Sequence, residues 1–429
     1  MLTETPQKSP FPNAVVTPAM PAAACRFCGA ALTHVFVDLG SSPLANNYLT
    51  SEQVREAESF YPLKAFVCAQ CFLVQLQVQE TPDRIFSDYA YFSSYTDSWV
   101  RHAHAYTERV VERFGLSRES SVVEIASNDG YLLQHFVARG IPVLGIEPAG
   151  NVAAAAEKKG IRTRVAFFGE ALARELAAGK RADLIVANNV LAHVPTLNDF
   201  VAGIAALLNP RGVATLEFPH LMRLMSENQF DTIYHEHFSY FSFTTVRSVF
   251  AAHGLTLFDV QELPTHGGSL RIFARHANDD SRGVAHAVTS LLEREDAAGV
   301  RTLASYSSFA EQVKATKREL LAFLIAAKRA AKSVVGYGAP AKGNTLLNYC
   351  GIRSDFLDYT VDRSPHKQGH FLPGTHIPIY GPETIAETKP TYLLILPWNL
   401  REEVMDQMTH IRQWGGEFVT PIPEVKVYA

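Results

Sequence analysis

The middle of the chain alternates short, β-branched apolar runs with longer helical patterns. Four such runs stand at 122–126, 143–146, 183–187 and 212–217. Helical patterns separate them, at 152–159 and 197–208. Short buried runs of this length predict strands, and strands that alternate with helices predict a parallel, doubly wound sheet. The ligands of such a sheet bind at the carboxyl ends of its strands.

A second region of the same kind lies in the last third of the chain. Residues 283–332 are helical in pattern, and one face carries the apolar residues Phe309, Val313, Leu320 and Leu324, which predicts packing. Apolar runs follow at 333–338, 358–362 and 392–396. These runs predict a second, smaller α/β module.

Two CxxC pairs, Cys25 with Cys28 and Cys68 with Cys71, lie near the N-terminus. Four thiolates at this spacing are typical of a structural zinc ion with tetrahedral coordination. Because four protein ligands leave no open coordination position, the predicted metal is not catalytic. Buried free cysteines or a redox pair are the alternatives. The long segment between the pairs must carry structure of its own.

The composition is that of an ordinary globular protein. Of 429 residues, 47% are hydrophobic and 19% are charged, and the net charge is −4. No long Lys/Arg block occurs, so we expect neither a nucleic-acid partner nor an anionic membrane surface. The apolar run 320–327 is too short to span a bilayer, and the first residues lack the features of a secretory signal. We expect a cytoplasmic protein, a monomer or a weak homo-oligomer.

The predicted strand ends of the middle region carry polar residues. Ser127, Asn128 and Gly130 form the turn after the first run, and Glu147 follows the second run. An acid at this spacing can hold two ribose hydroxyls, although a solvated strand-end carboxylate is the alternative. Gly130 is the one glycine of the turn. A pyrophosphate needs a closer backbone approach, so the turn favours S-adenosylmethionine over a dinucleotide.

Several segments occur in a fixed order behind the cysteine pairs, at 123–130, 145–148, 188–194, 233–237 and 336–344. In combination, and over nearly the whole chain, they resemble the nucleotide-sugar C-methyltransferases. Members of that family use S-adenosylmethionine to methylate a sugar carbon, typically C3 of a nucleotide-linked 4-keto-6-deoxyhexose. The resemblance implies that the cofactor is held by Ser127, Asn128, Gly130, Glu147, Asn188 and Asn189.

The resemblance and the patterns together predict an α/β protein of three parts. Residues 1–22 are expected to be a disordered tail and residues 23–82 a zinc-binding module. Residues 83–280 are expected to form a class I methyltransferase domain with a doubly wound, Rossmann-like sheet. Residues 281–429 are expected to form the C-terminal α/β module that binds the substrate nucleotide.

The segment 234–237, Tyr-His-Glu-His, is the candidate catalytic centre. Forming a carbon–carbon bond with a methyl sulfonium requires a carbanion beside a ketone, and therefore a base and a donor for the enolate oxygen. By the resemblance, His237 is the base. Glu236 would orient an imidazole or the sugar, and Tyr234 would bind the ketone or enolate oxygen. His193 would help to stabilise the enolate.

Other residues are expected around the sugar. Tyr89, Tyr91 and Tyr95 are interpreted as part of a lid, with Tyr91 as the member in the catalytic pocket. His235 is expected to contact substrate. A metal site at His235 and His237 is an alternative, but no second ligand pair is evident.

The C-terminal module carries its own glycine turn, Gly336-x-Gly338. Asp362 has nearly the spacing of a ribose-binding acid, which taken alone suggests NAD. The resemblance instead suggests a surface for the substrate's nucleotide diphosphate, with contacts from Lys342, Asn344, His366 and Lys367. The alternative is that these residues only cap and solvate the module. Residues 266–271 are interpreted as lining the sugar pocket, or, for Arg271, as forming a structural ion pair.

The leading hypothesis is a C-methyltransferase that acts on a nucleotide-linked keto-sugar. An O- or N-methyltransferase of a small metabolite is the first alternative, because Tyr234 to His237 would also activate a heteroatom. An NAD-dependent sugar oxidoreductase using the later glycine turn is the second. A noncatalytic zinc-bearing binding protein is the third.

Overall fold

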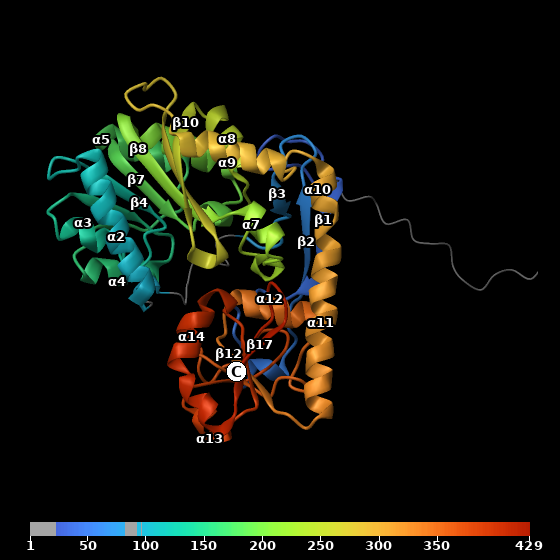
Figure 1. The fold of residues 1–429 in the computed structure, drawn as a ribbon. Helices are drawn as coiled ribbons and strands as arrows, with labels where there is room; N and C mark the ends of the chain where they lie inside the picture. Colours follow the sequence, from blue (N-terminus) through green and yellow to red (C-terminus); the bar gives the residue numbers. More distant parts are fainter. Residues whose placement is uncertain (1–22, 82–91, 96) are drawn as a thin grey trace, which may run out of the picture.

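The computed structural model describes residues 23–81, 92–95 and 97–429. Three sheets organise this described part of the chain, and the long helix α11 (Phe309–Arg329) runs along one side of the molecule from the N-terminal sheet to the C-terminal one (Figure 1). The predicted tail 1–22 lies outside the described residues. None of the described helices is long and apolar enough to cross a membrane.

The N-terminal sheet is antiparallel and has the strand order β1-β2-β3-β9. Its first three strands come from the cysteine region: β1 (His34–Ser42), β2 (Tyr61–Val67) and β3 (Val74–Leu76). The segment between the cysteine pairs therefore carries structure of its own, as predicted. The fourth strand, β9 (Ser239–Tyr240), directly follows the Tyr-His-Glu-His segment and pairs with β3. This pairing ties the candidate catalytic segment to the zinc-binding module.

The central sheet has seven strands in the order β10-β11-β8-β7-β4-β5-β6. They are β4 (Val122–Ile125), β5 (Val143–Ile146), β6 (Thr163–Arg164), β7 (Ala182–Asn188), β8 (Leu208–Pro219), β10 (Leu255–Leu263) and β11 (Ser269–His276). Each of the four predicted strands is present. We expected a parallel sheet, but the sheet is mixed. Strands β10 and β11 form a hairpin, and β11 runs antiparallel to β8.

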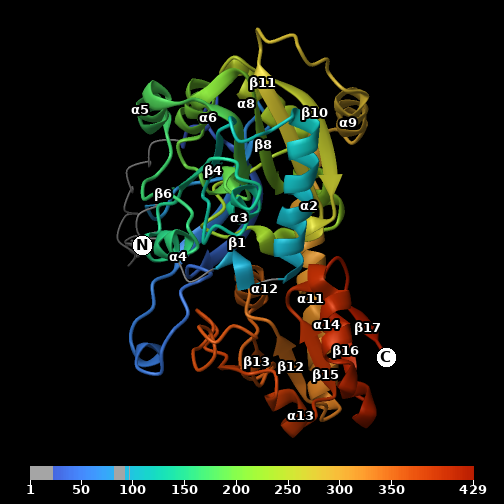
Figure 2. The same ribbon diagram turned by 90° about the vertical axis from the view of Figure 1, so that its left-hand side faces the viewer.

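Helices cover both faces of the central sheet, and Figure 2 shows α2 in front of it. They are α2 (Asp97–Phe114), α3 (Leu133–Val137), α4 (Gly150–Lys158), α5 (Glu170–Gly179), α6 (Leu197–Leu207), α8 (Phe243–Ala252) and α9 (His286–Ala297). The short helix α7 (Leu221–Ser226) instead buries Leu221 and Leu224 in the core shared by the N-terminal and C-terminal modules. The apolar strands β4 and β7 are buried on both faces, which is why they read as continuous hydrophobic runs. The doubly wound arrangement is confirmed.

The C-terminal sheet has the order β14-β13-β12-β15-β16-β17, and only β17 is antiparallel to its neighbour. Its strands are β12 (Val334–Tyr337), β13 (Thr360–Val361), β14 (Ile379–Tyr380), β15 (Tyr392–Ile395), β16 (Glu417–Thr420) and β17 (Lys426–Tyr428). The helices that follow α9 in the chain are α10 (Leu303–Ser307), α11, α12 (Ala341–Cys350), α13 (Thr384–Thr388) and α14 (Arg401–Gln407). The predicted apolar face of α11 is buried.

Candidate active site

The turn after β4 is shaped by backbone in the left-handed region. Ala126, Asn128 and Gly130 have φ values of 56°, 49° and 77°. A side chain at position 130 is excluded, since a Cβ there would lie 2.2 Å from Cδ1 of Ile161. The Ser93 N–H donates to Oδ1 of Asn128 at 2.8 Å, which holds the turn against the start of the described segment 92–95.

Glu147 joins the second strand to this turn. Its Oε2 accepts the Asn128 N–H at 3.0 Å, and its Oε1 accepts the Ala149 N–H at 2.9 Å. Burial raises the pKa of Glu147 above its ordinary value. Each carboxylate oxygen keeps a second lone pair, so two ribose hydroxyls can still donate to it. Glu147 therefore fits the predicted role.

Two further polar atoms face the same strand edge. Oγ of Ser127 and Oδ1 of Asn188 are buried and have no hydrogen-bond partner among the described residues. Buried polar atoms of this kind call for a partner, because leaving them without one is costly. The residues that sequence analysis assigned to S-adenosylmethionine thus meet at one edge of the central sheet, with donors and acceptors suited to hydroxyl and ammonium groups.

The imidazole of His237 is held in a defined tautomer. Nδ1 lies 2.8 Å from the carbonyl oxygen of Thr232, at the end of the 3₁₀ turn η4 (Phe230–Thr232). A carbonyl can only accept, so Nδ1 carries the proton and Nε2 offers a lone pair. The hydroxyl of Tyr234 lies 2.9 Å from that Nε2 and donates to it. His237 is therefore oriented as a neutral base.

His193 completes this group. It ends the 3₁₀ turn η3 (Leu191–His193) shortly after β7, and its ring meets that of His237 edge to face with centroids 4.6 Å apart. Burial lowers the pKa of His237 well below its usual value and that of His193 to about 4. Both rings are neutral near pH 7. The structure brings His193, Tyr234 and His237 together beside the edge of the central sheet.

The two residues between Tyr234 and His237 face other parts of the molecule. Oε1 of Glu236 accepts from Nδ2 of Asn46 in the N-terminal module at 2.7 Å. Burial raises the pKa of Glu236 to about 7. Nε2 of His235 lies 3.2 Å from the carbonyl oxygen of Pro62 on β2, and its ring packs on the edge of Tyr61. The structure thus places His235 against the zinc-binding module and not beside His237.

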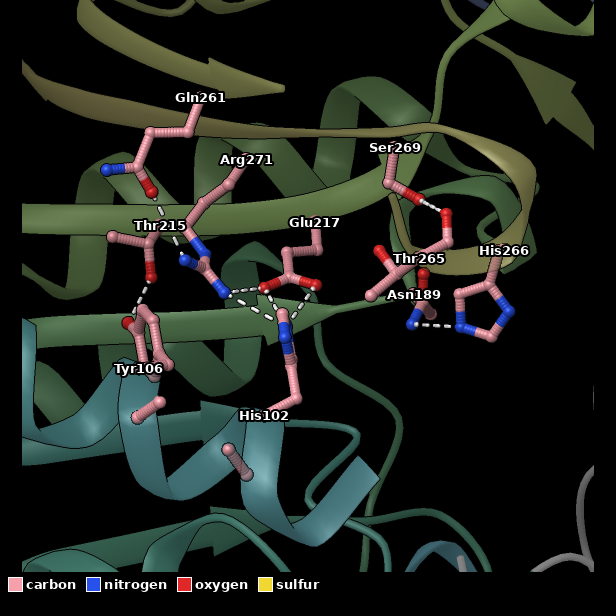
Figure 3. A network of polar contacts seen from close by, with 12 residues as sticks. His102, Tyr106, Asn189, Thr215, Glu217, Gln261, Thr265, His266, Ser269 and Arg271 are labelled. Carbon is pink, nitrogen blue, oxygen red and sulfur yellow. Dashed lines mark hydrogen bonds and ion pairs between the residues drawn. The ribbon is translucent and has the colours of Figure 1, made fainter. Parts of the chain in front are cut away.

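A network of buried polar groups supports the strand ends β8 and β11 (Figure 3). The guanidinium of Arg271 pairs with Glu217, and Nε2 of His102 lies 2.9 Å from the same carboxylate. This contact places Arg271 in a structural ion pair, one of the two predicted roles. At the edge of the network, Nδ2 of Asn189 lies 3.3 Å from Nε2 of His266.

The turn after β12 is closed by side chains. The Ala339 carbonyl accepts from the hydroxyl of Tyr48 at 2.5 Å and from Nζ of Lys367 at 2.9 Å. Asp362 accepts the N–H groups of Ala339 and Ser364, each at 2.8 Å. Nζ of Lys367 also lies 3.5 Å from this carboxylate, so Asp362, unlike Glu147, is paired with a cation.

The other predicted nucleotide contacts are dispersed around this turn. Asn344 is buried and donates to the carbonyl oxygen of Ala45 at 2.6 Å. His366 stacks on Phe92 with ring centroids 6.1 Å apart. Lys342 contacts another part of the C-terminal module, where Nζ donates to Oδ1 of Asn399 at 2.7 Å.

The four cysteines of the N-terminal module form one cluster. The sulfur atoms of Cys25, Cys28, Cys68 and Cys71 all lie within 4.8 Å of one another. Zn–S bonds of about 2.3 Å in a tetrahedron require sulfur separations of roughly this size. Gln75 is buried beside them and donates from Nε2 to Sγ of Cys25 at 3.1 Å, an outer contact that orients a ligand. The cluster fits zinc.

Three of the predicted residues receive little or no test. Tyr89 and Tyr91 lie outside the described residues, and Tyr95 is described only as the last residue of the 3₁₀ turn η2 (Ser93–Tyr95). Their role in a lid stays a prediction.

Other residues of the site were not found from the sequence. Asn46 and Tyr48 come from an unremarkable stretch of the N-terminal module, and Trp398 donates to Oδ2 of Asp231 at 2.7 Å from the far end of the chain. Asp231 stands three residues before Tyr234, so its position in a dense polar segment was the one available signal. The others carry no local signal because contacts distant in sequence create their roles.

The comparison with characterised proteins agrees with this arrangement. The chain is 39% identical to the C-methyltransferase NovU of Streptomyces niveus over 407 residues, which is 94% of this chain and 96% of that protein. The chain belongs to the C-methyltransferase family. It is a methyltransferase with a zinc-binding domain and a fold that uses S-adenosylmethionine. The oxidoreductase interpretation is therefore set aside.

Family models match three successive parts of this C-methyltransferase. Residues 25–86 match "Putative zinc binding domain", residues 99–260 match "Methyltransferase domain" and residues 264–423 match "C-methyltransferase C-terminal domain". A ubiquinone biosynthesis O-methyltransferase of Rhodopseudomonas palustris is 28% identical over 93 residues, 21% of this chain and 37% of that protein. Among solved structures, the 1,6-didemethyltoxoflavin-N1-methyltransferase of Burkholderia thailandensis is 18% identical with a TM-score of 0.35, covering 48% of this chain and 95% of that one.

Proposed function

We propose that this C-methyltransferase methylates C3 of a nucleotide-linked 4-keto-6-deoxyhexose. The observation that supports the proposal is the half-buried group of His193, Tyr234 and His237 beside the cofactor edge of the central sheet. A neutral imidazole with a defined tautomer and a hydroxyl next to it are the base and the donor that enolate formation requires.

His237 acts as the base in this proposal. In the free enzyme its Nε2 lone pair is occupied by the Tyr234 hydroxyl, at 2.9 Å. When the ketone oxygen of the substrate takes that hydrogen bond, the lone pair becomes available to the proton on C3. The Thr232 carbonyl then stabilises the imidazolium through the Nδ1 proton. The C–H electron pair passes into the enolate, and from there into the new carbon–carbon bond.

The cofactor is held by the first turn. Glu147 accepts the ribose hydroxyls, while Ser127, Asn128, Gly130, Asn188 and Asn189 surround the remainder of the molecule. When bound, S-adenosylmethionine supplies an electrophilic methyl group. Glu236 contributes by fixing the segment against Asn46, at 2.7 Å, so that His237 keeps its place.

The nucleotide part of the substrate lies along the second turn in this proposal. The ring of His366 stacks on Phe92. The ammonium of Lys367 donates to the Ala339 carbonyl, which holds it at the turn. Asn344 stabilises that surface by donating a hydrogen bond to the carbonyl oxygen of Ala45.

Exchange of the C3 proton tests the proposal. The enzyme is mixed with S-adenosylhomocysteine and either dTDP-4-keto-6-deoxyglucose or its UDP counterpart in D₂O, and NMR follows deuterium at C3. We expect exchange that depends on His237, so that His237→Asn slows it by about 10²–10⁴-fold. An O- or N-methyltransferase would leave the C3 proton in place, and exchange with neither sugar would refute the proposal.

A further inference from the structure

The side chain of Lys342 is clamped between two residues of the 3₁₀ turn η6 (Trp398–Leu400). Nζ donates to Oδ1 of Asn399 at 2.7 Å and stands 4.5 Å from the ring centroid of Trp398. The indole N–H of Trp398 in turn donates to Oδ2 of Asp231, at 2.7 Å. A cation over a Trp face is stabilised by the ring quadrupole, so the ammonium has a defined position.

That position is at the edge of the histidine group. Asp231 belongs to η4, directly ahead of the segment that carries Tyr234 and His237. Trp398 packs so closely on Gly267 that a Cβ there would lie 2.6 Å from its ring. The residue before Gly267 is His266. Burial is the main cause that lowers the pKa of both His266 and His237, and the charge of Lys342 adds to it. The contacts of Trp398 with Asp231 and Gly267 thus place Lys342 beside the loops that carry these histidines.

The chemistry needs a positive charge there. Tyr234 supplies only a neutral donor to the ketone oxygen in the proposed function, and His193 is neutral because burial lowers its pKa to about 4. The buried guanidinium of Arg271 is neutralised by Glu217. An enolate formed in a buried site is stabilised most strongly by a preorganised cation. Lys342 has the position and the charge for this task.

Asp231 provides a second indication that a ligand group binds at this place. Its Oδ1 is fully buried and has no hydrogen-bond partner within the described part of the chain. A buried carboxylate oxygen without a donor is unusual, since such atoms cost free energy unless a partner arrives. A hydroxyl of a bound sugar, next to the ketone that Lys342 faces, would supply that donor.

We propose that the Lys342 ammonium stabilises the enolate oxygen of the substrate, and that Trp398, Asn399 and Asp231 position it. This inference builds on the proposed function and reassigns Lys342, which the sequence grouped with the nucleotide contacts. In the step, the C3–H bond breaks, its proton passes to Nε2 of His237, and the carbonyl π electrons move onto oxygen. The ammonium donates a hydrogen bond to that oxygen and keeps its proton.

The test separates enolate stabilisation from nucleotide binding. C3 exchange in D₂O is measured for Lys342→Met and Lys342→Arg with S-adenosylhomocysteine and the dTDP-linked and UDP-linked keto-sugars. We expect the methionine variant to lower the exchange rate at saturation by about 10²-fold while KM changes by less than about 3-fold. The arginine variant should recover part of the rate because it restores the charge.

A matched control is Lys332→Met. Lys332 also lies over an aromatic ring of the C-terminal module, 5.0 Å from the centroid of Tyr392, but it is remote from the histidines. The Lys332→Met variant should exchange the C3 proton at the wild-type rate. If Lys342→Met does not fold, Lys342→Gln removes the charge and keeps a donor for Asn399.

Two results would overturn the assignment. One is wild-type exchange in the Lys342 variants. The other is a raised KM with unchanged exchange at saturation, which is the behaviour of a phosphate contact. Failure of the wild-type enzyme to exchange would instead contradict the proposed function itself, so the two failures are distinguishable.

Discussion

The two strand-to-helix turns of this enzyme, after β4 and after β12, share a pattern of hydrogen bonds to an acid. In each, an acid at the end of the next strand accepts an N–H from the turn: Glu147 from Asn128 at 3.0 Å and Asp362 from Ala339 at 2.8 Å. Each acid also accepts an N–H from the residue two positions after itself. The two turns differ in what covers them.

The second turn is covered by residues from elsewhere. The Tyr48 hydroxyl and the Lys367 ammonium both donate to its Ala339 carbonyl, and Lys367 also lies 3.5 Å from Asp362. At the first turn, Oγ of Ser127 and Oδ1 of Asn188 are buried and have no hydrogen-bond partner within the described residues. The comparison teaches that a strand, a glycine turn and an acid do not by themselves make a cofactor site. The surroundings decide whether the acid is available to a ligand.

Removal of zinc should separate the two turns most strongly. The N-terminal module carries Asn46 and Tyr48 in the loop between β1 and β2, so unfolding of this module uncovers the second turn and frees Glu236, while the first turn keeps its own contacts. Structural zinc supplies most of the folding free energy of small modules. We expect the Cys25→Ser/Cys68→Ser variant to lose turnover entirely and to retain S-adenosylmethionine binding, as measured by calorimetry.

Cys350→Ser is the control for zinc removal. Cys350 is a buried cysteine of the C-terminal module, outside the four-cysteine cluster. It should retain zinc and turnover. Full activity of the zinc-free double variant would show that the N-terminal module does not support the second turn.

Replacing each of the two acids by alanine should affect S-adenosylmethionine binding differently. Glu147→Ala is expected to weaken S-adenosylmethionine binding by about 10²-fold, since it removes a charged acceptor worth about 1.5–3 kcal/mol for each hydrogen bond. Asp362→Ala should leave that affinity unchanged. Calorimetric titration of both variants measures the difference, and an equal loss in the two would erase the distinction drawn between the turns.

Glu236 lies where the N-terminal module meets the catalytic segment, and its carboxyl should make the stability of the folded state depend on pH. Burial raises its pKa from 4.5 to about 7, so the folded state holds a proton that the unfolded state loses. The contribution of this carboxyl to the stability of the folded state should therefore fall as pH rises from about 4.5 to 7. Relative to the wild type, Glu236→Gln should gain up to about 3 kcal/mol between pH 5 and pH 8.

Urea unfolding at both pH values checks this expectation. Glu311→Gln is the control, because Glu311 is exposed on α11 and its pKa is lowered through hydrogen bonds from Arg318 and Lys314. That variant should show no gain at high pH. A Glu236→Gln protein with the pH dependence of the wild type would show that this carboxyl is ionised in the folded state.

The smallest expected effect comes from the cover of the second turn. Tyr48→Phe removes the hydroxyl that donates to Ala339 at 2.5 Å, a change of about 1 kcal/mol. We expect KM for the nucleotide sugar to rise about 3–10-fold with S-adenosylmethionine affinity unchanged. Tyr306→Phe removes a similar bond, from a hydroxyl to the Val300 carbonyl at 2.7 Å, far from both turns. Steady-state kinetics should show no change in KM for that control.

Much of the fold could be predicted because it is written in local patterns. The cysteine spacing identified the metal cluster, and the apolar runs identified β4, β5, β7, β8 and β12. The hairpin of β10 and β11 was missed. Its strands were not separated from the neighbouring patterns, and the antiparallel return of β11 depends on pairing with β8.

The site was predictable only in part. His193, Tyr234 and His237 come together as expected, since two of them share a short segment and the third follows a strand end. His235 faces Pro62 instead, because β9 pairs with β3 and sets the direction of each side chain just before it. The alternation of side chains along the segment could not be known without that pairing.

The sequence alone determined the residue types, the strand-and-helix order and the spacing of metal ligands, since these depend on neighbours within a few positions. Only the tertiary structure decided which acid is open to a ligand, which way Lys342 points, and that Asn46 and Tyr48 belong to the site. Those properties depend on burial and on contacts between segments far apart in the chain, such as Asn344 with Ala45, which are separated by 299 residues. Electrostatic interactions depend on distances in space, and the separation of two residues along the chain does not give that distance.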